Sequence, residues 1–357
     1  MAATRLSDLK NRLRRDNLDG LVITYMNQIR YLTGFSGDTA VLVVTPTQAE
    51  MLTDFRFKDQ ARLQVKNARV NITKGDSFTA LKDHPLLSAK NARVGYSGEY
   101  LTVSARERLA KHLPNALLTN ADSTLLGLGW VKDAAELTEI KRAVKIADVA
   151  FERILPIVKP GVRENEVAAE LEYQMAMLGS ERPAFESIVA SGFRSAMPHG
   201  VASQKKINKR DFVTIDFGAT VNGFVSDCTR TVVMGKASPR QKRIYDIVLR
   251  AQLAAIHRVR AGIAAKAVDD TARNVITKAG FGKEFGHGTG HGIGFYIHMG
   301  PRVSQLSTDK LMVNNVITIE PGIYISGFGG VRIEDDVLVT RTGCQVLNRA
   351  EKNLLEL

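Results

Sequence analysis

The chain has 357 residues, of which 44% are hydrophobic and 24% charged, a composition typical of a globular protein of about two domains. It contains no apolar run of the roughly 20 residues that a membrane helix requires, no hydrophobic signal segment and only two cysteines, so we expect a cytoplasmic protein without a disulfide framework. The net charge of +12 is spread along the chain rather than gathered with aromatic residues in one patch, and we therefore expect neither a nucleic-acid nor a membrane partner.

The first 125 residues alternate between strand-like and helix-like segments and are predicted to form an α/β domain. The segments typical of strands span residues 21–26, 40–45 and 93–98. Helical spacing of apolar residues is found at 5–17 and 102–113. This part of the chain shows no set of metal-binding or nucleophilic side chains, so we expect the chemistry to lie in the second part.

Residues 126–357 are predicted to form the second domain. Helices are expected, from capping signals and apolar spacing, at 133–154, 164–178, 238–262 and 268–279. The first of them begins with Asp133 and Glu136 in the spacing of a capping box. Trp130, the only tryptophan, is expected to pack at the junction between the domains.

The segment 211–231 places two carboxylates in apolar, strand-like surroundings. Asp216 and Asp227 flank the dipeptide Asn222-Gly223, which is typical of a tight hairpin turn. If the turn is centred on this dipeptide, the two aspartates are diagonal neighbours; a four-residue loop would make them face each other. In either register their side chains lie on the same face of the hairpin, close enough to share an ion.

The segment 318–339 repeats this arrangement with glutamates. A hairpin centred on Gly327 would pair Glu320 with Glu334. Between the two acidic segments lies a glycine-rich run that contains three histidines, His287, His291 and His298.

Carboxylates within apolar strands are costly to bury unless a proton, a partner or a cation neutralises them. Four of them with a histidine are explained most simply by bound metal. The cysteines lack the spacing of a structural zinc site, whereas an oxygen-rich set with one imidazole suits Mn²⁺ or Co²⁺. Four carboxylates exceed the need of one catalytic ion, so we expect two ions roughly 3.5–4 Å apart.

The order Asp, Asp, His, Glu, Glu occurs here in the contexts DFG, SDCTRT, TGHGIG, IEPGIY and VRIED. This pattern resembles the pita-bread metallopeptidases, in particular their branch of Xaa-Pro aminopeptidases and prolidases (Xaa-Pro dipeptidases). The segments at 31–44 and 186–200 resemble the same branch. The resemblance implies an α/β N-terminal domain, which helps to form a homodimer and shapes the substrate entrance. It also implies an α+β pita-bread catalytic domain, in which helices back a curved antiparallel sheet.

The resemblance also implies roles for individual residues. The metal ligands would be Asp216, Asp227, His291, Glu320 and Glu334, holding two divalent ions, with Mn²⁺ expected first and Co²⁺ or Zn²⁺ as alternatives. The catalytic and substrate-binding residues would be His199 near the substrate proline, His298 as donor to the oxyanion, Glu320 as proton acceptor, Tyr324 in the pocket and Arg332 as the group that orients Glu334. His287 is expected to be a structural neighbour of the ligands. Met299 and the pair Phe295-Tyr296 depart from the residues that the family usually carries, so the resemblance does not determine which side chains line the substrate pocket.

The function expected from this resemblance is metal-dependent hydrolysis of the bond between an N-terminal residue and a following proline. The overall layout and the sequence GFSGDTA favour an Xaa-Pro aminopeptidase, with a dipeptidase as the alternative. A methionine aminopeptidase would not need the N-terminal domain, and creatine amidinohydrolases lack the complete ligand set. A non-catalytic binding module of the same fold is the alternative from a different class.

Overall fold

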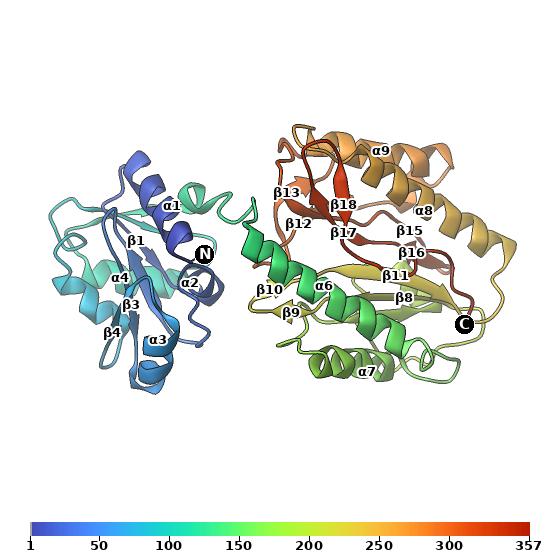
Figure 1. The fold of residues 1–357 in the computed structure, drawn as a ribbon, viewed down its shortest axis with the longest axis horizontal. Helices are drawn as coiled ribbons and strands as arrows, with labels where there is room; N and C mark the ends of the chain where they lie inside the picture. The colour runs from blue at the N-terminus through green and yellow to red at the C-terminus, as the bar shows by residue number, and fades with distance from the viewer. Residues whose placement is uncertain (1) are drawn as a thin grey trace. The chain divides into compact units, whose positions relative to one another are not determined.

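The computed structural model describes residues 2–357, with side chains from Arg5 onward. The chain divides into two compact units, residues 1–128 and 129–357 (Figure 1). We expected the boundary after residue 125, and the structure divides after Leu128. Within the described residues, no helix is both long enough and apolar enough to cross a lipid bilayer.

The first unit is built on a six-stranded sheet in the order β4-β3-β2-β1-β5-β6. Its strands are β1 (Gly20–Ile23), β2 (Val41–Val44), β3 (Ala49–Thr53), β4 (Arg69–Ile72), β5 (Arg93–Tyr96) and β6 (Leu117–Asn120). Its helices are α1 (Ala2–Arg15), α2 (Met26–Thr33), η1 (Phe55–Phe57), α3 (Lys58–Gln64), η2 (Ser77–Asp83), α4 (Val103–His112) and α5 (Asp122–Leu125). The pairs β1–β2 and β2–β3 are antiparallel and the others parallel, which makes this a mixed α/β sheet.

The second unit contains two pairs of long helices and antiparallel strands. Its helices are α6 (Ala134–Ile154), α7 (Glu164–Met177), η3 (Gly192–Ala196), α8 (Pro239–Arg258), α9 (Ala265–Lys278) and η4 (Gly282–Glu284). Its strands are β7 (Ile188–Ser191), β8 (Phe212–Phe217), β9 (Thr220–Val221), β10 (Phe224–Val225), β11 (Cys228–Val233), β12 (Gly290–Gly292), β13 (Met299–Val303), β14 (Val316–Ile319), β15 (Gly322–Ile325), β16 (Gly329–Arg332), β17 (Asp335–Val339) and β18 (Cys344–Val346).

The helices begin where their capping residues predict. Asp133 and Glu136 form the capping box of α6, and Ser238 accepts a hydrogen bond from the amide of Gln241 at the start of α8. Gly179, two residues beyond α7, has φ of 100°, a conformation that glycine adopts without strain.

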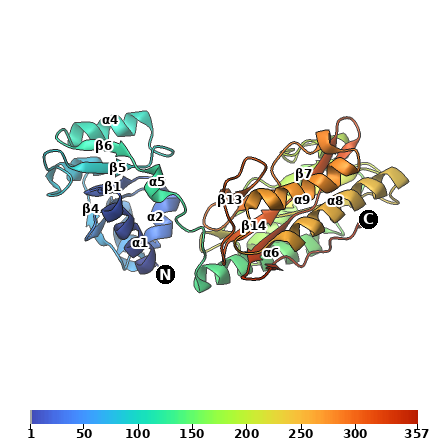
Figure 2. The same cartoon turned by 90° about the horizontal axis from the view of Figure 1, so that it is seen from above.

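Each helix pair backs its own sheet, and the strands lie between the two pairs (Figure 1). Helices α6 and α7 pack on the sheet β11-β8-β7 through residues such as Phe151, Leu171 and Ile215. Helices α8 and α9, side by side in Figure 2, pack on the sheet β13-β12-β14-β17-β18 through residues such as Val248 and Ile317. An α/β unit followed by this α+β unit confirms the predicted fold class.

Both acidic hairpins have the strand register of a turn centred on the predicted residues, Asn222-Gly223 in the first and Gly327 in the second. Asn222 and Gly223 have φ of 48° and 82°, as a type I′ turn requires, and Thr229 lies opposite Asp216. Asp216 and Asp227 are therefore diagonal neighbours. In the second hairpin Gly322 pairs with Arg332 and Gly327 stands at the turn, as the centring on Gly327 predicts.

Candidate metal centre

Interruptions in the two hairpins bring the acidic residues to one place. Asp216 lies within β8, whereas Asp227 falls between β10 and β11. Glu320 falls between β14 and β15, and Glu334 between β16 and β17. At Asp227, Glu320 and Glu334 the backbone leaves one sheet and enters the next, whereas Asp216 stands inside a strand.

His291 completes the cluster. Its Nε2 lies 3.4 Å from Glu320 Oε1 and 3.6 Å from Asp227 Oδ2. Ligand atoms of Asp227, His291 and Glu334 all lie within 4.8 Å of one another. The structure thus brings together every residue that the sequence analysis named as a metal ligand, with Asp216 close enough to raise the pKa of both Asp227 and Glu334.

The imidazole of His291 has the orientation of a ligand. Its Nδ1 lies 3.1 Å from the carbonyl oxygen of Gly292, so Nδ1 carries the proton and Nε2 offers its lone pair to the acidic cluster. Burial lowers the pKa of His291 to about 3, and the neighbouring His298 adds to this effect. The ring is therefore neutral, as metal binding requires.

The carboxyl groups carry more negative charge than their surroundings can stabilise. Burial raises the pKa of Asp227 well above its ordinary value, and the charges of Glu334 and Asp216 raise it further. Burial also raises the pKa of Glu334, with contributions from Glu320 and Asp216, and it raises the pKa of Glu320 to about 7 although Arg332 acts in the opposite direction. A bound cation would relieve this repulsion.

The residues fit a divalent cation on a second ground. Asp216 Oδ1 is buried and accepts no hydrogen bond from the described residues. An unsatisfied buried carboxylate oxygen is costly, and it points to a ligand that supplies positive charge. Four carboxylates with one imidazole form the donor set expected for ions of the Mn²⁺ and Co²⁺ type.

Arg332 lies beside the cluster but differs from its expected role. We expected it to orient Glu334, whereas its Nη2 forms an ion pair with Asp216 Oδ2 at 2.7 Å. The physical reason is Thr229, whose hydroxyl donates to Glu334 Oε2 at 2.6 Å and accepts from Arg332 Nε at 3.0 Å. Arg332 is therefore joined to Glu334 by hydrogen bonds through Thr229, while its charge acts to lower the pKa of Glu334 against the larger effect of burial.

The remaining predicted residues surround the same space. Arg332 Nη1 donates to the hydroxyl of Tyr324 at 2.9 Å, and this hydroxyl lies 2.9 Å from His287 Nε2. The rings of His291 and His298 have their centroids 4.4 Å apart. His199 is close enough to lower the pKa of both His287 and His298, in each case after the larger effect of burial.

With this geometry established, comparison with known proteins assigns the family. The model of the Creatinase/Prolidase N-terminal domain matches residues 5–128, and the model of Metallopeptidase family M24 matches residues 138–341. The chain belongs to metallopeptidase family M24. It is thereby a hydrolase, and the cluster of Asp, His and Glu is compatible with the dinuclear metal site expected from the sequence.

Relatives of this M24 peptidase match along almost the whole chain. The sequence is 38% identical to that of the Xaa-Pro dipeptidase of Pyrococcus horikoshii, covering 96% of this chain and 95% of the relative. The structure resembles that of an Xaa-Pro dipeptidase from Bacillus anthracis, with 38% identity, a TM-score of 0.95 and all of both chains covered. It also resembles that of an X-Pro aminopeptidase from Thermotoga maritima, with 33% identity, a TM-score of 0.90 and 99% of both chains covered.

Two residues of the M24 site were missed in the sequence analysis. Thr229 lies opposite Asp216, and the hairpin register alone would have identified it. Arg302 follows His298 by four residues and lies in β13, which begins only at Met299, so no strand periodicity in the sequence links the two residues. Its positive charge adds to the burial and to the His199 charge that lower the pKa of His298, whereas Asp216 acts in the opposite direction. The side chain is exposed and forms no hydrogen bond or ion pair with the described residues.

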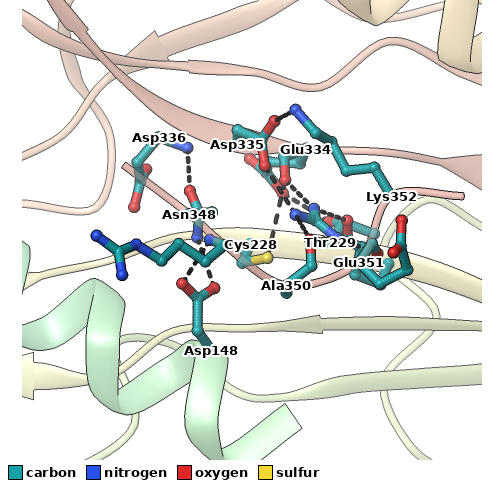
Figure 3. A network of polar contacts seen from close by, with 12 residues as sticks. Asp148, Cys228, Thr229, Glu334, Asp335, Asp336, Asn348, Ala350, Glu351 and Lys352 are labelled. Carbon is teal, nitrogen blue, oxygen red and sulfur yellow. Dashed lines mark hydrogen bonds and ion pairs between the residues drawn. The ribbon is translucent and has the colours of Figure 1, made fainter. Parts of the chain in front are cut away.

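A second layer of polar contacts holds the backbone around the predicted ligands (Figure 3). Asp336 Oδ2 accepts from the amide of Asp227 at 2.9 Å, and the amide of Asp336 donates to Asn348 Oδ1 at 2.7 Å. Arg230 is completely buried, donates to the carbonyl of Glu334 and forms an ion pair with Asp335 at 2.8 Å. Arg230 also donates to the carbonyls of Ala350 and Glu351, so the segment 348–352 joins the two acidic hairpins of the M24 domain.

The residues that depart from the family pattern lie close to the site. Met299 Sδ is 3.7 Å from Lys132 Nζ, which also donates to the carbonyl of Trp130 at 3.1 Å. Burial lowers the pKa of Lys132 to about 7, although Glu136 acts in the opposite direction. The indole of Trp130 covers Gly300 so closely that a Cβ there would lie 1.9 Å from it. Trp130 therefore packs within its own unit.

Proposed function

We propose that the protein is an Xaa-Pro dipeptidase that depends on two divalent ions, with Mn²⁺ as the expected metal. The observation that carries the choice of a dipeptide is the position of Arg302. Its side chain is exposed, its charge contributes to the lowered pKa of both His291 and His298, and it forms no hydrogen bond or ion pair with the described residues. A dipeptide, unlike the interior of a longer peptide, presents a carboxylate immediately after its proline, and arginine binds carboxylates in a bidentate geometry.

The metal ions would be held by Asp216, Asp227, His291, Glu320 and Glu334. When bound, such a pair of ions polarises the scissile carbonyl and lowers the pKa of a water molecule to about 7. The second-layer contacts of Thr229 and Asp336 keep Glu334 and Asp227 in place for this purpose.

The other residues would act on the substrate and its protons. Glu320 accepts the proton of the attacking water, and His298 donates a hydrogen bond to the oxygen of the scissile carbonyl as negative charge develops on it. His199 contacts the substrate near its proline. Tyr324 bridges Arg332 and His287, so its role is to hold both in position rather than to exchange protons.

The second candidate is the Xaa-Pro aminopeptidase that the sequence favoured. Its support is the likeness to the X-Pro aminopeptidase from Thermotoga maritima. The relatives called Xaa-Pro dipeptidase support the first candidate, and the lone Arg302 agrees with them.

The deciding experiment compares three substrates at equal Mn²⁺ concentration after removal of metal with a chelator: Xaa-Pro, Xaa-Pro-amide and Xaa-Pro-Xaa. Release of the first amino acid from Xaa-Pro is expected only when metal is restored. Release from Xaa-Pro-amide and from Xaa-Pro-Xaa is expected to be at least tenfold slower. Arg302→Met should raise KM for Xaa-Pro by about 10–100-fold, the loss of one charge-assisted pair, and leave the KM for the amide unchanged. Arg341→Met, which removes an exposed arginine elsewhere, is the matched control. Faster cleavage of the tripeptide would instead support the aminopeptidase.

The homodimer and the cytoplasmic location expected from the sequence stay predictions. Light scattering on the purified protein tests the first directly, since a dimer doubles the 39.1 kDa mass of the chain.

A further inference from the structure

Two buried carboxylates outside the metal site have matching surroundings. Glu164 is the first residue of α7, and Asp269 lies in the second turn of α9. Both side chains are completely buried, and each forms an ion pair with an arginine, Arg194 at 2.9 Å and Arg273 at 2.9 Å. Neither carboxylate takes part in the metal cluster.

Glu164 joins both ends of the loop that carries His199. Its Oε1 accepts from the amide and the hydroxyl of Ser191, at 2.7 and 2.9 Å, before the loop. Its Oε2 accepts from the amide and the hydroxyl of Ser203, at 3.1 and 2.5 Å, after it. Arg194, held by the same oxygen, donates to the carbonyl of Val201 at 2.6 Å. The eleven residues between Ser191 and Ser203, which include His199, are therefore closed by one carboxylate.

Asp269 fixes the segment between His287 and His291 in the same way. Its Oδ1 accepts from the amide and the hydroxyl of Thr289, at 2.9 and 2.8 Å. Arg273, paired with the same carboxylate, donates to the carbonyl of His287 at 2.7 Å. The carbonyl of Thr289 in turn accepts from the amide of Glu320 at 2.8 Å. The buried carboxylate of Asp269 thus positions two backbone segments. One carries His291, and the other, bonded to Thr289, carries Glu320.

We propose that Glu164 and Asp269 are positioning residues of the active site, each of which holds one histidine-bearing segment through its arginine and its hydroxyl-bearing residue. The two differ in what they position. Asp269 acts on metal ligands and therefore on metal affinity, whereas Glu164 acts on His199 and therefore on substrate. The assignment for Glu164 rests on the proposed function, because that function gives His199 its contact with the proline.

The matching substitutions are Glu164→Gln and Asp269→Asn, which keep the shape and remove the charge. In each variant the new amide NH2 group, which is a hydrogen-bond donor, faces groups that donated hydrogen bonds to the carboxylate. Glu166→Gln and Asp270→Asn change exposed acidic residues on the same two helices and are the controls. Ser203→Ala and Thr289→Val remove one donor from each arrangement and serve as milder variants if the first pair does not fold.

The first measurement is Mn²⁺ affinity by calorimetry on metal-free protein. Asp269→Asn should weaken binding by about 10–100-fold, the effect usual for groups that support metal ligands, whereas Glu164→Gln and both controls should stay within about twofold of the unsubstituted protein. Unchanged affinity in Asp269→Asn and Thr289→Val would overturn the role of Asp269. This readout does not require any peptide to be cleaved, so it stands even if the proposed function fails.

The second measurement isolates the effect of Glu164 on His199. At saturating Mn²⁺, Glu164→Gln should lower kcat/KM for Xaa-Pro by about tenfold, and by less than twofold when His199 is already alanine. Equal losses in both backgrounds would show a general structural role and overturn the proposal. The imidazole resonances of the seven histidines give a readout that is independent of turnover. Glu164→Gln should shift the signal that His199→Ala removes, and Glu166→Gln should not; an unmoved His199 signal counts against the proposal whether or not Xaa-Pro is the substrate.

Discussion

The hydroxyl of Thr229 donates to Glu334 Oε2 at 2.6 Å and so connects the two hairpins that carry the acidic residues. The hydroxyl oxygen of Thr229 accepts a hydrogen bond from Arg332 Nε at 3.0 Å, and this fixes the direction of the hydroxyl proton toward Glu334. Glu334 is thus oriented by a neutral donor, while the arginine is paired with Asp216. This division leaves the charge of Glu334 available to a cation.

Thr229→Val should weaken Mn²⁺ binding by about 10–100-fold, because Glu334 loses the donor that orients it while the side-chain volume is kept. Calorimetry on metal-free protein measures the change. Thr231→Val, in the same strand as Thr229, is the matched control, since its hydroxyl donates to the carbonyl of Arg332 in β16 and to no predicted ligand. Equal affinity for the two variants would contradict the role given to Thr229.

Arg332→Met should destabilise the metal-free protein more than the metal-bound protein. The substitution leaves the Asp216 carboxylate, which is 13% exposed, without its cation; the loss of one partner of a buried pair typically costs about 3–5 kcal/mol, an upper bound here. Bound Mn²⁺ would supply positive charge to the same carboxylate. The deficit in Tm, measured in chelator and then in Mn²⁺, is therefore expected to narrow on metal addition. Arg142→Met, at an exposed helical ion pair, should change Tm little in either condition. A deficit of the same size with and without metal would refute this account.

The hairpins were predictable because strand geometry leaves few choices. A side chain alternates faces at every residue, so placing Asp216 with Asp227, and Glu320 with Glu334, on one face restricts each turn to a few positions. The Asn-Gly dipeptide and the glycine at 327 then fix the registers that the structure has. Helix starts were predictable for a similar reason, since the capping box of α6 satisfies backbone donors locally.

Features that depend on contacts between distant segments were not predictable. The residues 21–26 read as one strand, but β1 ends at Ile23 and Met26 begins α2, because Ile29 and Leu32 gain burial on a helix. The placement of Arg302 beside the histidines depends on how β13 pairs with β12, which no local pattern encodes. The pairing of Arg332 with Asp216 rather than Glu334 depends on a threonine from the other hairpin.

Gly290→Ala should disrupt the metal centre, although the sequence does not distinguish this glycine from its neighbours. A Cβ at Gly290 would lie 1.9 Å from the carbonyl oxygen of Thr318, so β12 and β14 would have to separate where His291 and Glu320 meet. We expect a loss of about 1–3 kcal/mol in the free energy of unfolding, measured in urea, and weaker Mn²⁺ binding. Gly286→Ala, at an exposed glycine whose Cβ would meet no atom within 4 Å, should change stability by less than about 0.5 kcal/mol. Equal stability of the two variants would show that the strands can separate without cost.

Lys132 should make the stability of the protein depend on pH in the alkaline range. Burial lowers the pKa of its ammonium group from the ordinary 10.5 to about 7, with Glu136 acting in the opposite direction. Between these two values the unfolded chain binds a proton that the folded chain does not, so the contribution of Lys132 opposes folding fully below pH 7 and disappears as the pH rises toward 10.5.

Lys132→Met should therefore stabilise the protein at pH 6.5, on the order of 2–4 kcal/mol, because the uncharged side chain avoids desolvation and still contacts Met299. The gain should shrink steadily in urea unfolding at pH 8 and pH 9.5, since the free energy needed to remove the proton from the lysine on folding falls as the pH approaches 10.5. Lys141→Met, at an exposed lysine of α6, should show no such trend. A gain that stays constant with pH would mean that Lys132 keeps its proton in the folded state, and that a partner close to Trp130 stabilises its charge.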